Sequence, residues 1–129
     1  MLGDSPVTAF LATTNAARAA EFYGATLGLR VVSEDPFALV FEANGVELRI
    51  QKVEQLTPQP FTAFGWRVDD VSKAVRALVE RGVTFARFPG VQQDTLGIWA
   101  APSGARIAWF HDPDGNVLSL AQYGPPNAR

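Results

Sequence analysis

The chain has 129 residues, a formal charge of −2 and no cysteine, with 47% hydrophobic and 19% charged residues. This length suits one domain with a sizeable core, and the composition is that of a globular protein rather than a disordered one. The missing cysteines exclude disulfides and thiolate metal sites, and they fit a cytoplasmic protein. Basic residues are scattered and no apolar run reaches the ~18 residues of a membrane helix, so we expect neither nucleic-acid nor membrane binding.

The first half of the chain predicts a strand, a helix and three further strands. Asn15 is a helix-capping type, and apolar residues then recur on one face until Gly28 ends the pattern. The dipeptide Asn44-Gly45 lies between two apolar runs, which is typical of a hairpin turn. The expected elements are a strand at 7–12, a helix at 16–27, and strands at 29–32, 37–41 and 46–51.

The second half repeats this order. Asp70 is again a capping type, Gly82 ends the helical pattern, and DPDGN (112–116) forms a turn. The expected elements are a strand at 63–68, a helix at 71–79, and strands at 83–88, 106–110 and 117–122.

Spacing supports an internal repeat. Asn15 and Asp70 are 55 positions apart, whereas Gly45 and Gly115 are 70 apart, which places an insertion near 90–103. The repeat predicts an α+β fold with two βαβββ modules, at about 7–51 and 61–122, within a single domain of 1–129. A proline-containing linker at 52–60 joins them, and we expect the modules to pair into one curved mixed sheet. The alternative is coincidence, because any α+β chain has strands and helices that end at glycines.

Three segments carry a family resemblance: NAARAAEFYGATLGL (15–29), WRVDDVSKAVRALVERGV (66–83) and WFHDPDGNVLSL (109–120). Together they resemble the vicinal oxygen chelate superfamily, which contains glyoxalases, bleomycin-resistance proteins and dioxygenases, over nearly the whole chain. The resemblance implies that the sheet of paired modules curves around a cup-shaped cavity. It also implies that catalytic members hold a divalent metal there with His, Glu or Gln, from the first and last strand of each module.

The same resemblance locates the metal positions in this chain. Counting from the helix caps and the turn glycines gives Thr8, Arg49, Ala63 and Ser119. None is a usual ligand of a catalytic metal, and Arg49 brings a permanent positive charge. We therefore predict no metal and no other cofactor. The single histidine, His111, lies outside these positions.

Strand alternation and the inserted segment predict the residues around the cup. The candidate ligand-binding residues are Thr8, Phe10, Glu47, Arg49, Gln51, Arg67, Trp99 and Ser119. Two guanidinium groups favour a ligand with a carboxylate, phosphate or carbonyl oxygen. An ion pair between Arg49 and Glu47 is the alternative interpretation. Similarly, Trp99 either covers a ligand or partner subunit or packs against the sheet.

Two functions compete. The first is a metal-free binding protein for a small molecule, as the bleomycin-resistance branch implies, working as a homodimer. The second is an enzyme, either metal-dependent or acid–base: a glyoxalase-like lyase, an isomerase or a ring-cleavage-type dioxygenase. Its candidate groups would be His111, Glu47 and Tyr23, but the sequence assigns no catalytic residue. The missing ligand set favours the binding protein.

Overall fold

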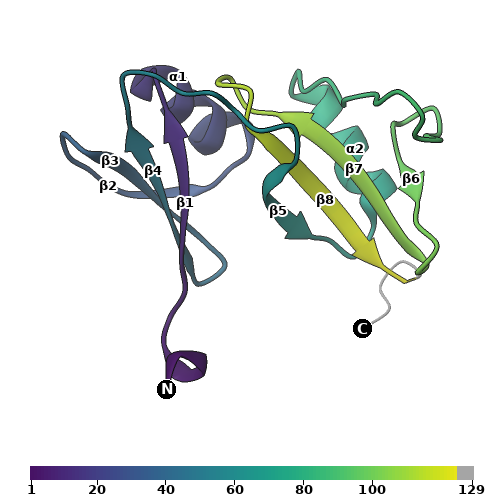
Figure 1. The fold of residues 1–129 in the computed structure, drawn as a ribbon, viewed down its shortest axis with the longest axis horizontal. Coiled ribbons are helices and arrows are strands. Elements are labelled where there is room, and N and C mark those ends of the chain that lie inside the picture. Colours follow the sequence, from purple (N-terminus) through teal and green to yellow (C-terminus); the bar gives the residue numbers. More distant parts are fainter. Residues whose placement is uncertain (125–129) are drawn as a thin grey trace. The chain divides into compact units, whose positions relative to one another are not determined.

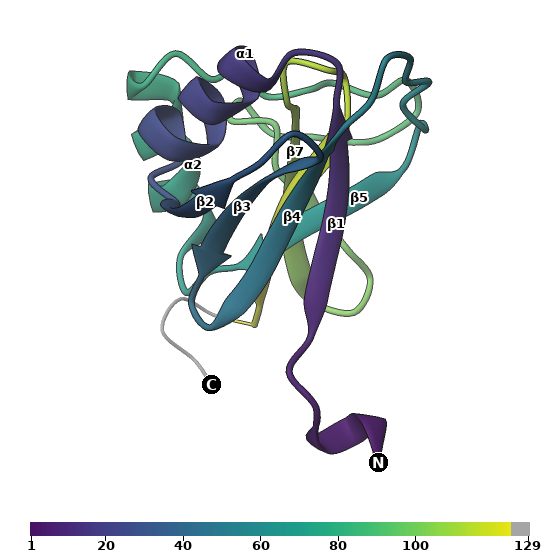
Figure 2. The same ribbon diagram turned by 90° about the vertical axis from the view of Figure 1, so that its left-hand side faces the viewer.

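The computed structural model describes residues 1–124, and Figures 1 and 2 show its ribbon from two directions. It divides into two compact units, Met1–Thr57 and a second unit that begins at Pro58. This boundary falls inside residues 52–60, the proline-containing segment that was expected to be a linker. Within the described residues, no helix is both long enough and apolar enough to cross a membrane.

The first unit contains a four-stranded sheet in the order β1-β4-β3-β2, in which β1 is parallel to β4 and the other neighbours are antiparallel. Its elements are the 3-10 helix η1 (Leu2–Asp4), β1 (Thr8–Thr13), α1 (Ala16–Ala20), the π-helix η2 (Glu21–Thr26), β2 (Arg30–Glu34), β3 (Ala38–Ala43) and β4 (Val46–Lys52).

Local chemistry explains these boundaries. The Asn15 side chain accepts a hydrogen bond from the backbone N–H of Arg18 at 3.1 Å, so it caps α1 as expected. Asn44 and Gly45 both have positive φ, 48° and 86°, which suits the tight turn between β3 and β4. The helix expected at 16–27 forms, but its second half is a π-helix rather than an α-helix. There the backbone N–H of Leu27 reaches the carbonyl of Phe22 at 2.9 Å, five residues earlier.

The second unit contains a four-stranded sheet in the order β5-β8-β7-β6, with β5 parallel to β8. Figure 1 shows α2 lying along this sheet, where it packs against β7 and β8. Its elements are β5 (Thr62–Arg67), α2 (Val71–Glu80), β6 (Trp99–Ala100), β7 (Ala105–His111) and β8 (Val117–Tyr123).

The strand expected at 83–88 is wrong. Only an isolated bridge between Phe85 and Phe110 forms there, and the chain then leaves the sheet at Pro89-Gly90. The free edge of β7 is shared by two short segments, because β6 from the inserted segment pairs with Arg106 and Ile107. The pairing of segment 83–88 with β7 is therefore limited to the end of β7 that contains Phe110.

Each sheet buries one face. In the first unit this face carries Leu11, Leu48 and Ile50, and in the second it carries Leu118 and Leu120. The α+β class and the two modules are thus confirmed. The hydrogen-bonded strands of the described residues form two separate sheets, one in each unit, whereas we expected one continuous curved sheet. The difference arises because every strand pairs only within its own module.

Candidate functional site

Five of the predicted ligand-binding residues lie on one face of the first sheet. β1 and β4 pair in parallel, with Thr8 beside Glu47, Phe10 beside Arg49, and Ala12 beside Gln51. Side chains alternate along a strand, so this face is opposite to the one that buries Leu48 and Ile50. Phe10 is 55% exposed although it is a large apolar side chain. The structure therefore brings these five residues together on an open face.

Arg49 and Glu47 form an ion pair on this face. The Arg49 guanidinium lies 3.6 Å from the Glu47 carboxylate, and the two side chains are 34% and 48% exposed. A pair this accessible to water contributes little to stability, about 0–1 kcal/mol. A guanidinium has five N–H donors, so most of them remain available for another oxygen ligand.

A carboxylate near this face has a perturbed acidity. Asp35 precedes β3 and accepts hydrogen bonds from the backbone N–H groups of Phe37 (2.7 Å) and Ala38 (2.9 Å). These two bonds hold the pKa of the Asp35 carboxyl below its ordinary value of 3.8, and the charges of Arg49 and Lys52 lower it further. Asp35 is thus a charged residue with a structural role in the turn between β2 and β3.

Two more predicted residues lie on the exposed face of the second sheet. Ser119 in β8 is paired with Gly65 in β5 and with Trp109 in β7. Arg67 is paired with Ala121 in the next row of the same face, and its guanidinium lies 4.6 Å from the centre of the Tyr123 ring. That contact is a cation–π interaction and keeps the positive charge over an aromatic surface.

Gly65 allows a close approach between β5 and β8. A Cβ atom at this position would lie 2.3 Å from Oγ of Ser119 and 2.8 Å from its carbonyl oxygen. The Ser119 hydroxyl therefore fills the space where a side chain of residue 65 would lie. No residue other than glycine fits at position 65 without displacing β8.

Trp109 and Thr62 also belong to this face, and sequence reasoning missed them. The Trp109 indole N–H donates to the Thr62 hydroxyl at 3.2 Å, and its ring lies 6.0 Å from that of Trp99. β5 has a bulge at Ala63, so Thr62 rather than Ala63 is the partner of Val117. Counting residue pairs outward from the DPDGN turn would have paired Trp109 with Ser119, and so would have placed Trp109 on this face.

The four metal positions implied by the resemblance hold an unsuitable donor set. Arg49 is already paired with a carboxylate, Ala63 has no donor atom, and the Ser119 hydroxyl packs over Gly65. Within residues 1–124, no three His, Cys, Asp or Glu side chains are grouped so that they could hold a metal ion. These residues do not fit a divalent catalytic metal.

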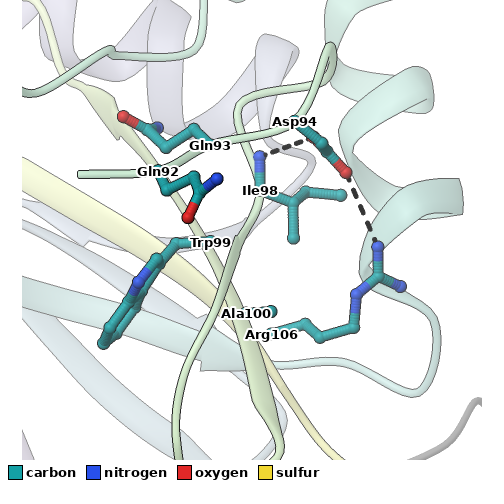
Figure 3. Close-up of a pocket in the computed structure, with 7 residues that line it drawn as sticks. All are labelled: Gln92, Gln93, Asp94, Ile98, Trp99, Ala100 and Arg106. Carbon is teal, nitrogen blue, oxygen red and sulfur yellow. Dashed lines mark hydrogen bonds and ion pairs between the residues drawn. The ribbon is translucent and has the colours of Figure 1, made fainter.

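The remaining predicted residue, Trp99, lies at a pocket beside β6. The pocket has a volume of about 380 Å³, and Figure 3 shows its side chains. Trp99 stands at one end of the view, and Asp94 and Arg106 point toward each other at the other end. The lining combines an indole, amide groups and one residue of each charge.

Comparisons with known proteins identify the family. The family model described as Glyoxalase/Bleomycin resistance protein/Dioxygenase superfamily matches residues 6–120. A comparison with curated proteins found no match.

Solved structures show the same fold. A member of the Glyoxalase/bleomycin resistance protein/dioxygenase superfamily from Sphaerobacter thermophilus is 26% identical, with a TM-score of 0.71 and coverage of 95% of this chain and 99% of that one. A glyoxalase family protein from Enterococcus faecalis is 20% identical, with a TM-score of 0.68 and coverage of 94% and 99%. A lactoylglutathione lyase from Agrobacterium tumefaciens is 14% identical, with a TM-score of 0.70 and coverage of 92% and 93%. The chain therefore belongs to the Glyoxalase/Bleomycin resistance protein/Dioxygenase superfamily.

Proposed function

We propose that this protein binds a small molecule on the exposed face of its first sheet, around Arg49, and does so without a metal. One observation carries the proposal: a metal position of the family is held by Arg49, whose guanidinium lies 3.6 Å from a carboxylate. A permanent cation at this place opposes a divalent metal but attracts an anionic or carbonyl oxygen of a ligand.

The surroundings of Arg49 favour an aromatic anion. Phe10 lies beside Arg49 in the register of β1 and β4, and its ring is more than half exposed. An exposed aromatic ring next to a guanidinium with unused donors offers both an apolar surface and a polar anchor. Arg67 over the Tyr123 ring repeats this combination on the second sheet.

A binding screen with aromatic carboxylates and antibiotic-like compounds tests the proposal, because a ligand of the native state raises the unfolding temperature. For any anionic hit, Arg49→Ala should weaken binding by about tenfold or more, since a charge-assisted hydrogen bond is lost. Arg18→Ala is the matched control, because it removes one positive charge from an exposed position in α1. The two variants therefore have the same net charge. Equal affinity of the Arg49→Ala variant and the unmodified protein would remove Arg49 from the binding site.

We also propose a homodimer. β2 is an edge strand of the first sheet, and its Val31 and Val32 side chains are both more than half exposed, as is nearby Phe37. An open edge with apolar side chains is a common place for a second chain to associate. Sedimentation should show a species of twice the 13.9 kDa chain mass. A monomer at all concentrations tested would contradict this.

A further inference from the structure

The pocket beside β6 is built by a part of the chain that has no counterpart in the first unit. Gln92, Gln93 and Asp94 lie in the inserted segment, and Ile98 and Trp99 follow where it joins the sheet. The volume of about 380 Å³ is within the ~300–1,000 Å³ typical of small-molecule sites. This insertion therefore adds a pocket of useful size to the repeated fold.

Hydrogen bonds hold one wall of the pocket in place. The Gln93 amide nitrogen donates to the carbonyls of Ala86 (2.9 Å) and Gly97 (2.8 Å), and its oxygen accepts from the N–H of Phe88 (2.9 Å). The Asp94 carboxylate accepts from two further backbone N–H groups, each at 2.9 Å. A ligand would meet a wall that is already ordered, which lowers the entropic cost of binding.

The polar end of the pocket carries a donor and an acceptor side by side. The Arg106 guanidinium lies 3.7 Å from the Asp94 carboxylate, and the two side chains are 35% and 45% exposed. Arg106 also lies 3.5 Å from the Ser72 hydroxyl, so both of its contacts are long and leave N–H donors for a ligand. The charges of Arg106 and Asp94 cancel, so the lining has no net charge.

The other end offers an aromatic surface. The Trp99 ring is held by Trp109, whose centroid lies 6.0 Å away at an interplanar angle of 31°. Figure 3 shows the exposed Gln92 side chain beside Trp99, away from the Asp94–Arg106 pair. A fixed indole favours a planar ring, and Gln92 adds one more amide to the rim.

We propose that this pocket binds a neutral, planar aromatic molecule that carries an amide. The amide carbonyl accepts from Arg106 and its N–H donates to Asp94, so both charged groups are satisfied at once. A carboxylate in the same position satisfies Arg106 but meets the negative charge of Asp94. The pocket's lining residues all belong to the second unit and Arg49 to the first, and the inference does not depend on the function proposed for the face around Arg49.

A matched pair of probes tests the chemical class. Naphthalene-2-carboxamide and naphthalene-2-carboxylate share one ring and differ in charge, and each is titrated into the purified full chain by calorimetry or ligand-observed NMR. The carboxamide should bind saturably. In the Arg49→Ala variant, which lacks the anchor for aromatic anions on the first sheet, it should bind about tenfold or more tightly than the carboxylate, because only the acid is repelled by Asp94. No saturable binding of the carboxamide, or equal binding of the two probes by this variant, would overturn the proposal.

Two variants on one hairpin test the location. Ala100 is exposed and lines the pocket, so Ala100→Leu fills it without removing any contact of the loop. This variant should lose carboxamide binding, whereas Ser103→Leu, an equally bulky change in the exposed turn of the same hairpin, should keep it. Carboxamide binding that survives Ala100→Leu would place the site elsewhere.

A third variant tests the role of the carboxylate. Asp94→Asn keeps an acceptor for the loop N–H groups but removes the charge, so the preference for the carboxamide should fall to less than about threefold. An unchanged preference would exclude Asp94 as its origin. Arg49→Ala should leave the carboxamide affinity unchanged, whereas it should weaken any carboxylate binding at the face proposed for the first sheet. This difference separates the two sites.

Discussion

The two units have the same buried faces but different exposed faces. Leu48 in the first unit corresponds to Leu118 in the second by the 70-residue spacing, and both are fully buried. On the exposed faces, the same spacings relate the pair Phe10–Arg49 to the pair Gly65–Ser119. Each pair is adjacent in the register of its two parallel strands. The repeat therefore conserves packing and leaves the chemistry of the open face free to differ.

Helix capping, like the buried faces, is the same in both units. Asp70 accepts a hydrogen bond from the backbone N–H of Lys73 at 3.1 Å, as Asn15 does from Arg18 in the first unit. A buried side chain of the sheet supports one cap, since the Gln122 amide oxygen accepts from the N–H of Val71 at 3.0 Å. Each unit thus has a side-chain cap for the backbone N–H groups at the start of its helix, which would otherwise lack a partner.

The largest difference between the two units is expected in the free energy of unfolding when Phe10 and Gly65, which occupy equivalent positions, are replaced by alanine. Gly65→Ala should lower the free energy of unfolding by about 1–3 kcal/mol, because its Cβ would collide with Ser119. Phe10→Ala should change this free energy by less than about 1 kcal/mol, because the ring is already 55% exposed. Urea unfolding of the two variants, followed by circular dichroism, measures both quantities.

Gly24→Ala is the control for the glycine substitution. A Cβ there would meet only Phe41, at an ordinary contact distance of 3.7 Å, and alanine favours a helix over glycine by about 0.5–1 kcal/mol. This variant should match or exceed the stability of the unmodified protein. A Gly65→Ala variant as stable as Gly24→Ala would mean that β5 and β8 do not approach as closely as described.

Much of the fold could be predicted because short-range chemistry determines it. Asn15, Asp70 and the Asn44-Gly45 turn placed their elements within one or two residues. The strand expected at 83–88 does not form, because the edge of β7 pairs partly with this segment and partly with β6. The local sequence pattern does not show which of the two segments pairs with that edge. The change from α-helix to π-helix after Ala20 was likewise not predicted. It includes the buried Tyr23, whose ring lies 6.1 Å from that of Phe41.

The exposed faces were predictable only in part. Simple alternation placed Thr8, Phe10 and Arg49 on one side of the first sheet, where β1 is regular. In the second sheet the bulge at Ala63 shifts the alternation by one residue, so Thr62 takes the place that Ala63 was expected to hold. Trp109 was missed because its face is set by pairing with Ser119, which requires the hairpin register.

The smallest expected effect concerns two turns that aspartates stabilise, Asp35 in the first unit and Asp94 in the second. The pKa of Asp35 is lowered in the folded state, so its stabilising effect is present above pH 3.8 and is lost as the pH falls through the lower, folded pKa. Asp35→Ala should therefore lower the unfolding temperature slightly at pH 7. Scanning calorimetry should show the difference shrinking in acid, and a difference independent of pH would contradict this role of the charge.

The central claim is that the face carrying Arg49 holds an organic ligand in place of a metal. Elemental analysis of protein purified without chelator tests it most directly, followed by a second analysis after incubation with zinc and desalting. We predict fewer than about 0.1 metal ions per chain in both samples, because three suitable protein ligands are normally needed and the four positions supply none. About one zinc, nickel, manganese or iron per chain would contradict the account.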